Sequence, residues 1–138
     1  ILCFDPHPNT VFKRAVLPEL TTLEQRFKLL HYYGVDQCVC LNFTQQFAAL
    51  TAAQFLNEII LKRLQAHAVV VGENFRFGRM REGDVGVLQQ WGLHKKVSVF
   101  PLSLVVCQDQ PVSTRRCRTC LADQDALEKL IGRKTLLV

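Results

Sequence analysis

The sequence predicts an α/β protein with a layered, mostly parallel sheet and helices on both faces of that sheet. Apolar segments of strand length, at 1–4, 35–41, 66–71 and 97–106, alternate with segments of helical periodicity. Strands joined by helices pair in parallel, and strands without polar alternation are typical of a sheet buried on both faces. The length suits one domain, and we expect residues 1–138 to form it.

The first helix is expected over 23–33. Thr21 and Glu24 have the spacing of a capping box, in which each side chain binds the backbone of the other residue. Gly34 follows the last residue with helical periodicity and is placed to end the helix.

A second helix is expected over 52–64, where Thr51 and Gln54 again have capping-box spacing. Its helical spacing gives it one apolar face. The residues expected on that inner face are Phe55, Ile59, Ile60 and Leu64.

Three shorter helices are expected in the rest of the chain. Asp84 is suited to cap one that Gly92 stops, and Ser113 or Thr114 is suited to cap the next. A final helix should end near Gly132.

Nothing at the start of the given sequence points to secretion. No basic stretch is followed by a signal-like apolar segment, and no apolar run approaches the roughly 20 residues of a membrane helix. We therefore expect a cytoplasmic protein without a membrane partner. The chain opens directly on the strand that begins at Ile1, without Met or a polar lead-in, so we expect that residues are missing before it.

The formal charge of +5 is concentrated in two basic segments, 76–81 and 115–118. Such segments suit a polyanionic ligand such as a nucleotide, and equally a nucleic-acid surface or a solvated face. The six cysteines include the pairs Cys117/Cys120 and Cys38/Cys40. A zinc site usually needs two well-spaced pairs, so we expect reduced cysteines inside the fold and no protein-ligated metal.

The candidate ligand-binding segments follow strands, because ligands of parallel α/β sheets bind beyond the carboxyl ends of the strands. The first segment is the turn 5–8, in which Pro6 and Pro8 flank His7. Two prolines fix a rigid turn that can present carbonyls and ring edges to a planar ligand. The alternative is a simple strand-exit turn with an exposed histidine.

The second segment runs from Gly72 to Gly78, after the third strand candidate. Asn74 offers both a donor and an acceptor to the edge of a heteroaromatic ring, and Phe75 and Phe77 offer faces for stacking. The alternative is a hairpin-like loop whose phenylalanines fill the core.

The third segment begins at Ser113 and Thr114 and continues through Arg115 to Arg118. Hydroxyls and backbone amides at a helix start, followed by arginines, are typical of a phosphate site. The alternative is an ordinary N-cap before a solvated basic turn.

A set of short motifs extends over essentially all 138 residues. In chain order they are Phe4-Asp5-Pro6-His7-Pro8, Leu20-Thr21-Thr22-Leu23, Gly34-Val35-Asp36, Phe47-Ala48-Ala49-Leu50-Thr51, Phe55, the stretch 71–78, Arg81-Glu82-Gly83-Asp84, Val112-Ser113-Thr114, Arg118, Leu121 and Leu130-Ile131-Gly132-Arg133. Together they resemble the FMN-adenylylating domain of the bifunctional riboflavin kinase/FAD synthetase family.

The resemblance implies a Rossmann-like nucleotidylyltransferase fold and transfer of AMP from ATP to FMN, giving FAD and pyrophosphate, with Mg²⁺ as cofactor. It also implies a fused riboflavin kinase module in most relatives, small-molecule nucleotides as partners and no nucleic acid. The flavin-binding residues that it implies are Pro6, His7, Pro8, Asn74, Phe75 and Phe77.

The resemblance further implies that Ser113, Thr114 and Arg118 act in catalysis and, together with Arg115, hold the ATP phosphates. Arg115 stands where the family usually has Thr, so one hydroxyl is exchanged for a cation. The family's Gly-x-Phe-Asp-Gly-x-His-x-Gly-His motif and the kinase module do not occur in this sequence. We therefore expect these 138 residues alone to bind flavin weakly and turn over poorly.

Two other functions fit some of these residues. A nucleotidylyltransferase of the same superfamily with another acceptor, such as nicotinamide mononucleotide or phosphopantetheine, would use the same phosphate motif. A non-catalytic module would bind nucleic acid through the two basic segments or sense flavin.

Overall fold

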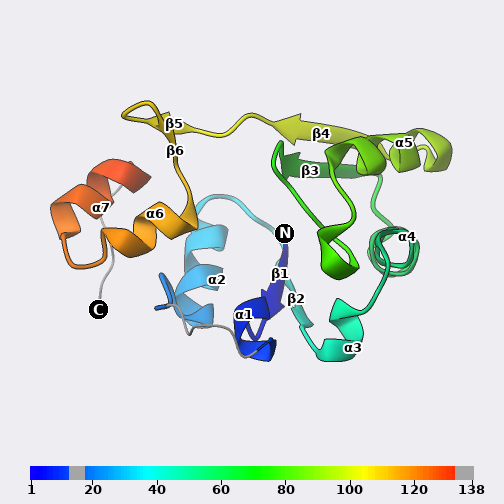
Figure 1. Ribbon diagram of the computed structural model, residues 1–138, viewed down its shortest axis with the longest axis horizontal. Coiled ribbons are helices and arrows are strands. Elements are labelled where there is room, and N and C mark those ends of the chain that lie inside the picture. Colours follow the sequence, from blue (N-terminus) through cyan, green and yellow to red (C-terminus); the bar gives the residue numbers. More distant parts are fainter. Residues whose placement is uncertain (13–17, 133–138) are drawn as a thin grey trace. The chain divides into compact units, whose positions relative to one another are not determined.

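The strands of the described chain lie in three separate two-stranded sheets (Figure 1). The structure is a computed structural model that describes residues 1–12 and 18–132. These residues group into two units, one of residues 1–12, 18–43 and 105–132 and one of residues 44–104, each described below by itself. The described part contains no helix long and apolar enough to cross a membrane.

The first unit is built on a parallel strand pair. β1 (Leu2–Asp5) pairs with β2 (Val39–Asn42), in register from Leu2 opposite Val39 to Asp5 opposite Asn42. Its helices and the antiparallel β5·β6 pair are α1 (Pro8–Val11), α2 (Leu23–Tyr32), β5 (Val106–Cys107), β6 (Gln110–Pro111), α6 (Thr114–Thr119) and α7 (Gln124–Ile131).

The core of the first unit lies between α6 and α7. Cys117, Leu127 and Leu130 are buried there. The apolar residues packed around them are Leu20, Cys107, Val112, Cys120, Leu121 and Ile131. These contacts join the two C-terminal helices to the β5·β6 hairpin and fix where α6 begins.

The second unit also contains a parallel pair, β3 (Ala68–Gly72) and β4 (Ser98–Leu102). Its helices are α3 (Gln45–Ala48), α4 (Ala52–Gln54), the π-helix η1 (Phe55–Arg63), the 3₁₀ turn η2 (Arg79–Arg81) and α5 (Val85–Lys95). Its buried residues are Ala52, Phe55, Leu56, Ile59, Ile60, Phe77, Leu88 and Val97. Three of the four inner-face residues expected on the second helix are thus buried, and Leu64 is half-buried.

The sequence placed the first capping box one residue too early. Thr22, not Thr21, begins α2: its hydroxyl accepts from the Gln25 amide at 3.2 Å, and the Gln25 side chain accepts from the Thr22 amide at 2.9 Å. A glutamine closes the box as well as a glutamate does. The capping box of Thr51 and Gln54 is confirmed.

Gly92 does not stop α5, which continues to Lys95. A Cβ on Gly92 would lie 2.6 Å from the Val97 carbonyl oxygen and 2.8 Å from Cγ2 of Val99. The glycine therefore lets the helix approach β4 closely, and it is a packing residue instead of a terminator.

The expected strand over 97–106 is interrupted. β4 ends at Leu102, and β5 begins a hairpin in which Gln108 and Asp109 adopt positive φ. The second strand is also shorter than expected, since β2 begins only at Val39.

The parallel pairs and the helices between them confirm the mixed α/β class. The expectation of strands buried on both faces is wrong for β3 and β4 as the structure describes them. Val70 and Phe100, which lie opposite each other, are 59% and 53% exposed. A uniformly apolar strand therefore does not establish that both faces of the sheet are covered.

Candidate nucleotide site

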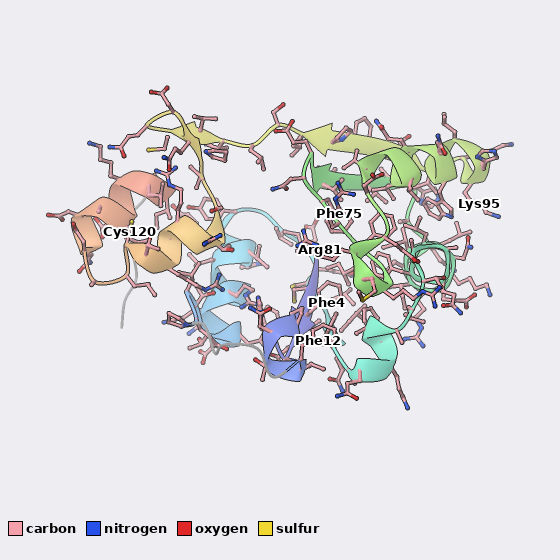
Figure 2. The ribbon with its side chains drawn as sticks, in the orientation of Figure 1. Phe4, Phe12, Phe75, Arg81, Lys95 and Cys120 are labelled. Atoms are coloured by element: carbon pink, nitrogen blue, oxygen red, sulfur yellow. The ribbon has the colours of Figure 1, made fainter. Side chains whose placement is uncertain are left out.

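The turn after β1 is held by aromatic packing and by a histidine cap. Phe4 meets Phe43 edge to face, with ring centroids 5.5 Å apart, and Phe12 meets Phe43 in the same way at 6.1 Å. The Phe43 amide donates to the Asp5 carbonyl oxygen at 3.1 Å. Figure 2 labels Phe4 and Phe12, which flank the turn along the chain. No periodic pattern in the sequence marks Phe12 or Phe43.

His7 is the N-cap of α1, and Pro8 occupies the first helical position. Nδ1 of His7 accepts a hydrogen bond from the Asn9 amide at 3.1 Å, a role that requires an unprotonated Nδ1. Burial lowers the pKa of His7 below its ordinary value, and the positive charges of Arg118 and Arg26 lower it further. The imidazole is therefore favoured in its neutral form.

The same electrostatic coupling links two predicted segments within the first unit. Arg118 lies on α6 and His7 lies in the turn after β1, yet the charge of Arg118 acts on the imidazole. Arg26 of α2 acts on it as well, and Glu19 opposes both arginines. The sequence did not single out Arg26 or Glu19, because each occupies an unremarkable position before or within an amphipathic helix.

The start of α6 agrees with the predicted cap. The Ser113 hydroxyl accepts from the Arg116 amide at 3.3 Å, so Ser113 is the N-cap and Thr114 is the first helical residue. Arg115 is exposed and makes no hydrogen bond or ion pair within the described residues. Its guanidinium is therefore available to an anion.

The other two arginines of the motif have structural partners. Arg118 donates from Nε to the Pro18 carbonyl oxygen at 2.9 Å, which directs the rest of its guanidinium. Arg116 donates from Nη1 to three carbonyl oxygens of the β5·β6 hairpin. Arg116 belongs to a basic segment of the sequence, but in the structure its side chain holds the hairpin against α6.

The loop after β3 belongs to the second unit and is closed by a short antiparallel bridge. Phe77 and Gly83 exchange two backbone hydrogen bonds, of 3.1 and 2.9 Å. A Cβ on Gly83 would lie 2.6 Å from the Phe77 ring, and one on Gly78 would lie 2.6 Å from the Ala52 nitrogen. The loop is thus a packed structure whose two glycines allow close contacts.

The two phenylalanines of this loop differ in exposure. Phe77 is 6% exposed and packs between Phe75 and Phe55, with centroid distances of 5.5 and 5.8 Å. Phe75 is half-buried and stacks on Phe77 at an interplanar angle of 19°. Asn74 is exposed, and its amide makes no hydrogen bond to the described residues. The alternative in which the phenylalanines of this loop fill the core is thus confirmed for Phe77.

The basic character of the loop is partly neutralised. Arg76 Nη1 lies 3.2 Å from Asp84 Oδ2, and Arg79 Nε lies 3.6 Å from Glu82 Oε2. The Val87 amide at the start of α5 lowers the pKa of Asp84 below its ordinary value, and Arg76 adds to this effect. These pairs direct two of the arginines toward the protein's own acids.

The six cysteines form no disulfide in the structure. Cys117 of the Cys117/Cys120 pair is buried in the core of the first unit. Among the residues that the structure describes, no three His, Cys, Asp or Glu side chains form a group suited to a metal ion.

The comparisons with known proteins agree with the motifs. The family model of FAD synthetase matches residues 1–116, which include both strand-end segments and end before Arg118. The bifunctional riboflavin kinase/FMN adenylyltransferase of Escherichia coli K12 is 33% identical over 135 residues, covering 96% of this chain and 43% of that protein. The protein of the same description from Pseudomonas fluorescens is 32% identical, with the same coverage.

A solved structure described as a macrolide-efflux protein from Streptococcus pneumoniae has a similar fold. Its TM-score is 0.82 at 23% identity, over 96% of this chain and 43% of that one. The chain spans less than half the length of the two curated relatives just described. The match over most of its residues nevertheless shows that the chain belongs to the FAD synthetase family.

Proposed function

We propose that this chain is the FMN adenylyltransferase part of a flavin-nucleotide synthetase, and that it transfers AMP from ATP to FMN. The observation that carries the proposal is the family match over residues 1–116, which contains the turn at His7, the loop at Asn74 and the helix start at Ser113. The products are FAD and pyrophosphate. A phosphate oxygen of FMN attacks the α-phosphorus of ATP, and the bond from that phosphorus to the bridging oxygen of the β-phosphate breaks.

Such a reaction needs positioning and charge stabilisation more than it needs a covalent nucleophile. Arg115 supports this role because it is exposed and unpaired within the described residues. Arg118 supports it because the Pro18 carbonyl fixes its Nε and thereby the plane of its guanidinium. We assign both arginines, with Ser113 and Thr114, to the ATP phosphates and the departing pyrophosphate.

For the flavin, we assign recognition of the ring edge to Asn74 and stacking to Phe75. The exposed amide of Asn74 can both donate and accept, as the pyrimidine edge of a flavin requires. Phe77 is too deeply buried to offer a face, so we assign it the role of holding Phe75 in place.

We assign the turn of Pro6, His7 and Pro8 to the same ligand. The prolines restrict the turn before binding, which reduces the entropy that a ligand must overcome. The neutral imidazole favoured at His7 can donate from Nε2 while Nδ1 is engaged by Asn9.

Mg²⁺ remains part of the proposal, but no residue of this chain is assigned to it. The described residues form no acidic or histidine cluster of the kind that holds a metal. A magnesium ion in nucleotide sites is coordinated largely by phosphates and water. When bound, it would neutralise phosphate charge.

We also propose that both units belong to one Rossmann-like domain, and that the parent protein carries a riboflavin kinase module. The first proposal is supported by the similarity of the whole chain to one solved fold. The second is supported by the relatives, whose descriptions name both activities and of which this chain covers less than half.

The proposal is tested by comparing FMN with other acceptors of the adenylyl group. The chain is incubated with ATP, Mg²⁺ and FMN, and FAD is measured chromatographically over long incubation. Parallel reactions replace FMN by nicotinamide mononucleotide or phosphopantetheine. We expect FAD to be the adenylylated product formed fastest. Faster adenylylation of another acceptor would overturn the proposal.

A nucleic-acid-binding role fits the structure less well. The pairs Arg76–Asp84 and Arg79–Glu82 occupy two of the arginines that would face a phosphate backbone. Tight RNA or DNA binding with steep salt dependence would favour that role instead.

A further inference from the structure

Three thiols converge where β1 pairs with β2. Cys3 Sγ lies 3.5 Å from Cys38 Sγ. Cys40 lies directly opposite Cys3 in the parallel register, and its thiol contributes to the raised pKa of Cys3. All three residues are half-buried, so small molecules from solvent can reach this cluster.

The backbone next to Cys38 is held on both sides. The N-terminal amine of Ile1 donates to the Gln37 carbonyl oxygen at 2.6 Å, and the Val39 amide donates to the Ile1 carbonyl oxygen at 2.8 Å. These bonds place Cys38 beside Ile1, diagonally from Cys3. These backbone hydrogen bonds therefore hold the Cys38 sulfur close to the Cys3 sulfur.

The protonation state of Cys3 indicates which thiol of the cluster is oxidised first. Burial raises the pKa of Cys3 to about 12, and hydrogen bonds with Cys38 and Cys40 add to this effect. At neutral pH Cys3 is a thiol, and a thiol is a poor nucleophile toward oxidants. Oxidation must therefore begin on one of its neighbours.

We propose that Cys3 and Cys38 form a redox-sensitive pair that a hydroperoxide converts to a reversible disulfide. The Cys38 sulfur gives up its proton to solvent and attacks an oxygen of the peroxide, the O–O bond breaks and the leaving oxygen takes up a proton, which gives a sulfenic acid and releases water or an alcohol. The Cys3 sulfur then attacks the Cys38 sulfur, and the Cys3 proton leaves with the sulfenic hydroxyl as a second water. Two thiols lose two electrons in all, and the peroxide gains them.

Cys38 is favoured over Cys40 for two reasons. Its sulfur lies 3.5 Å from that of Cys3, and a disulfide requires closure to roughly 2.05 Å. Cys38 also precedes β2, whereas Cys40 lies within the strand ladder. A local adjustment at Cys38 therefore disturbs fewer backbone hydrogen bonds.

The experiment is peptide mapping of the whole chain after brief treatment with hydrogen peroxide. The chain is digested with trypsin without reduction after the remaining thiols have been alkylated. Cleavage separates Cys3, in the peptide 1–13, from Cys38 and Cys40, in the peptide 29–62. We expect a cross-linked pair of these two peptides, which dithiothreitol splits, with a fragmentation pattern that places the bond on Cys38.

Three variants sharpen the assignment. Cys38→Ser should abolish the cross-link, whereas Cys40→Ser and Cys120→Ser should leave it in place. The wild-type map alone decides the question if a variant fails to fold. Absence of a cross-link in wild type, a bond between Cys3 and Cys40, or a bond between Cys38 and Cys40 would each overturn the proposal.

Discussion

Nη1 of Arg116 donates a hydrogen bond to the Gln110 carbonyl oxygen at 2.8 Å. The same nitrogen reaches the carbonyl oxygens of Cys107 and Pro111 at 3.1 Å. A single guanidinium thus joins α6 to the hairpin that precedes it. Its neighbour Arg115 has no such partner among the described residues. Two adjacent arginines of one motif therefore differ: Arg116 is bound to the hairpin, whereas Arg115 is free, within the described residues, for the ligand-binding role that we propose for it.

Arg116→Met should lower the free energy of unfolding by about 1–3 kcal/mol, because hydrogen bonds from a charged group to backbone acceptors are lost. Urea denaturation followed by circular dichroism measures the change. Arg115→Met is the matched control, and its stability should change by no more than about 0.5 kcal/mol. Equal effects of the two substitutions would contradict the division of roles.

Ligand affinity should show the opposite order, with a larger effect of Arg115→Met than of Arg116→Met. Arg115→Met removes an exposed cation from the proposed phosphate site, so affinity for a non-hydrolysable ATP analogue should fall by roughly tenfold, which corresponds to about 1.4 kcal/mol. Isothermal titration measures this affinity. Unchanged affinity in Arg115→Met would exclude Arg115 from the phosphate site.

Gly78→Ala should destabilise the second unit for two reasons. Gly78 has a φ of +75°, and its added Cβ would lie 2.6 Å from the Ala52 nitrogen. With a ψ of 171° this positive φ lies in a region that is essentially restricted to glycine, which costs another residue about 1–3 kcal/mol, and overpacking adds about 1–3 kcal/mol. Gly34→Ala is the control, since Gly34 has a φ of +81° with no atom within 4 Å and should show only the cost of its positive φ.

The loss at Gly78 can be followed through Trp91, the chain's one tryptophan. Its Nε1 donates to Asn57 Oδ1 at 3.1 Å within the second unit. Its fluorescence during urea denaturation therefore reports the unfolding of that unit. A Gly78→Ala variant whose transition, followed through Trp91, matches that of the unsubstituted chain would contradict both costs.

The pKa of His7 should lie below 6.5 in the folded chain, as an NMR titration of its imidazole would show. Arg118→Gln should raise this pKa part of the way back, because burial, the larger cause, remains. Glu19→Gln should lower it further, since the Glu19 charge acts in the opposite direction. A His7 pKa that neither substitution moves would contradict the coupling.

The same shift predicts a pH dependence of stability. Between pH 6.5 and the lower folded pKa, the unfolded chain binds a proton at His7 more readily than the folded chain does. The His7 contribution therefore reduces stability as pH falls through this window, and no contribution remains above it. His7→Gln should remove this part of the pH dependence in paired urea titrations at pH 7.5 and 5.5.

Substitutions of the two loop residues should have different effects, on FMN binding for Asn74 and on stability for Phe77. Phe77→Ala should cost about 3–5 kcal/mol, because it leaves a cavity between Phe55 and Phe75. Asn74→Ala should leave stability nearly unchanged, since the Asn74 amide makes no hydrogen bond to the described residues, and should weaken FMN binding. A fully stable Phe77→Ala variant would contradict the core assignment.

Local signals in the sequence predicted much of this structure. Capping residues identified the starts of four helices, at Thr51, Asp84, Ser113 and, one residue displaced, Thr22. These signals depend on hydrogen bonds between neighbours in the chain, so a single sequence contains them. The order of the motifs likewise predicted the family that the comparisons show.

Contacts between distant residues were not predictable in the same way. Nothing local distinguishes Gly92, which allows α5 to approach β4, from a glycine that ends a helix. Nothing local shows that Arg116 holds a hairpin while Arg115 does not. The division of Phe75 and Phe77 into a half-buried and a buried ring also depends on Phe55, twenty residues or more away along the chain.

If this chain transfers AMP to FMN, it must bind FMN. The most direct measurement is a fluorescence titration of FMN with the chain, repeated with Mg²⁺ and a non-hydrolysable ATP analogue, alongside Asn74→Ala. We predict quenching of the flavin that saturates, tightens with the ATP analogue and weakens in the variant. Absence of quenching up to roughly millimolar concentrations, an affinity of only about 4 kcal/mol, would contradict the claim.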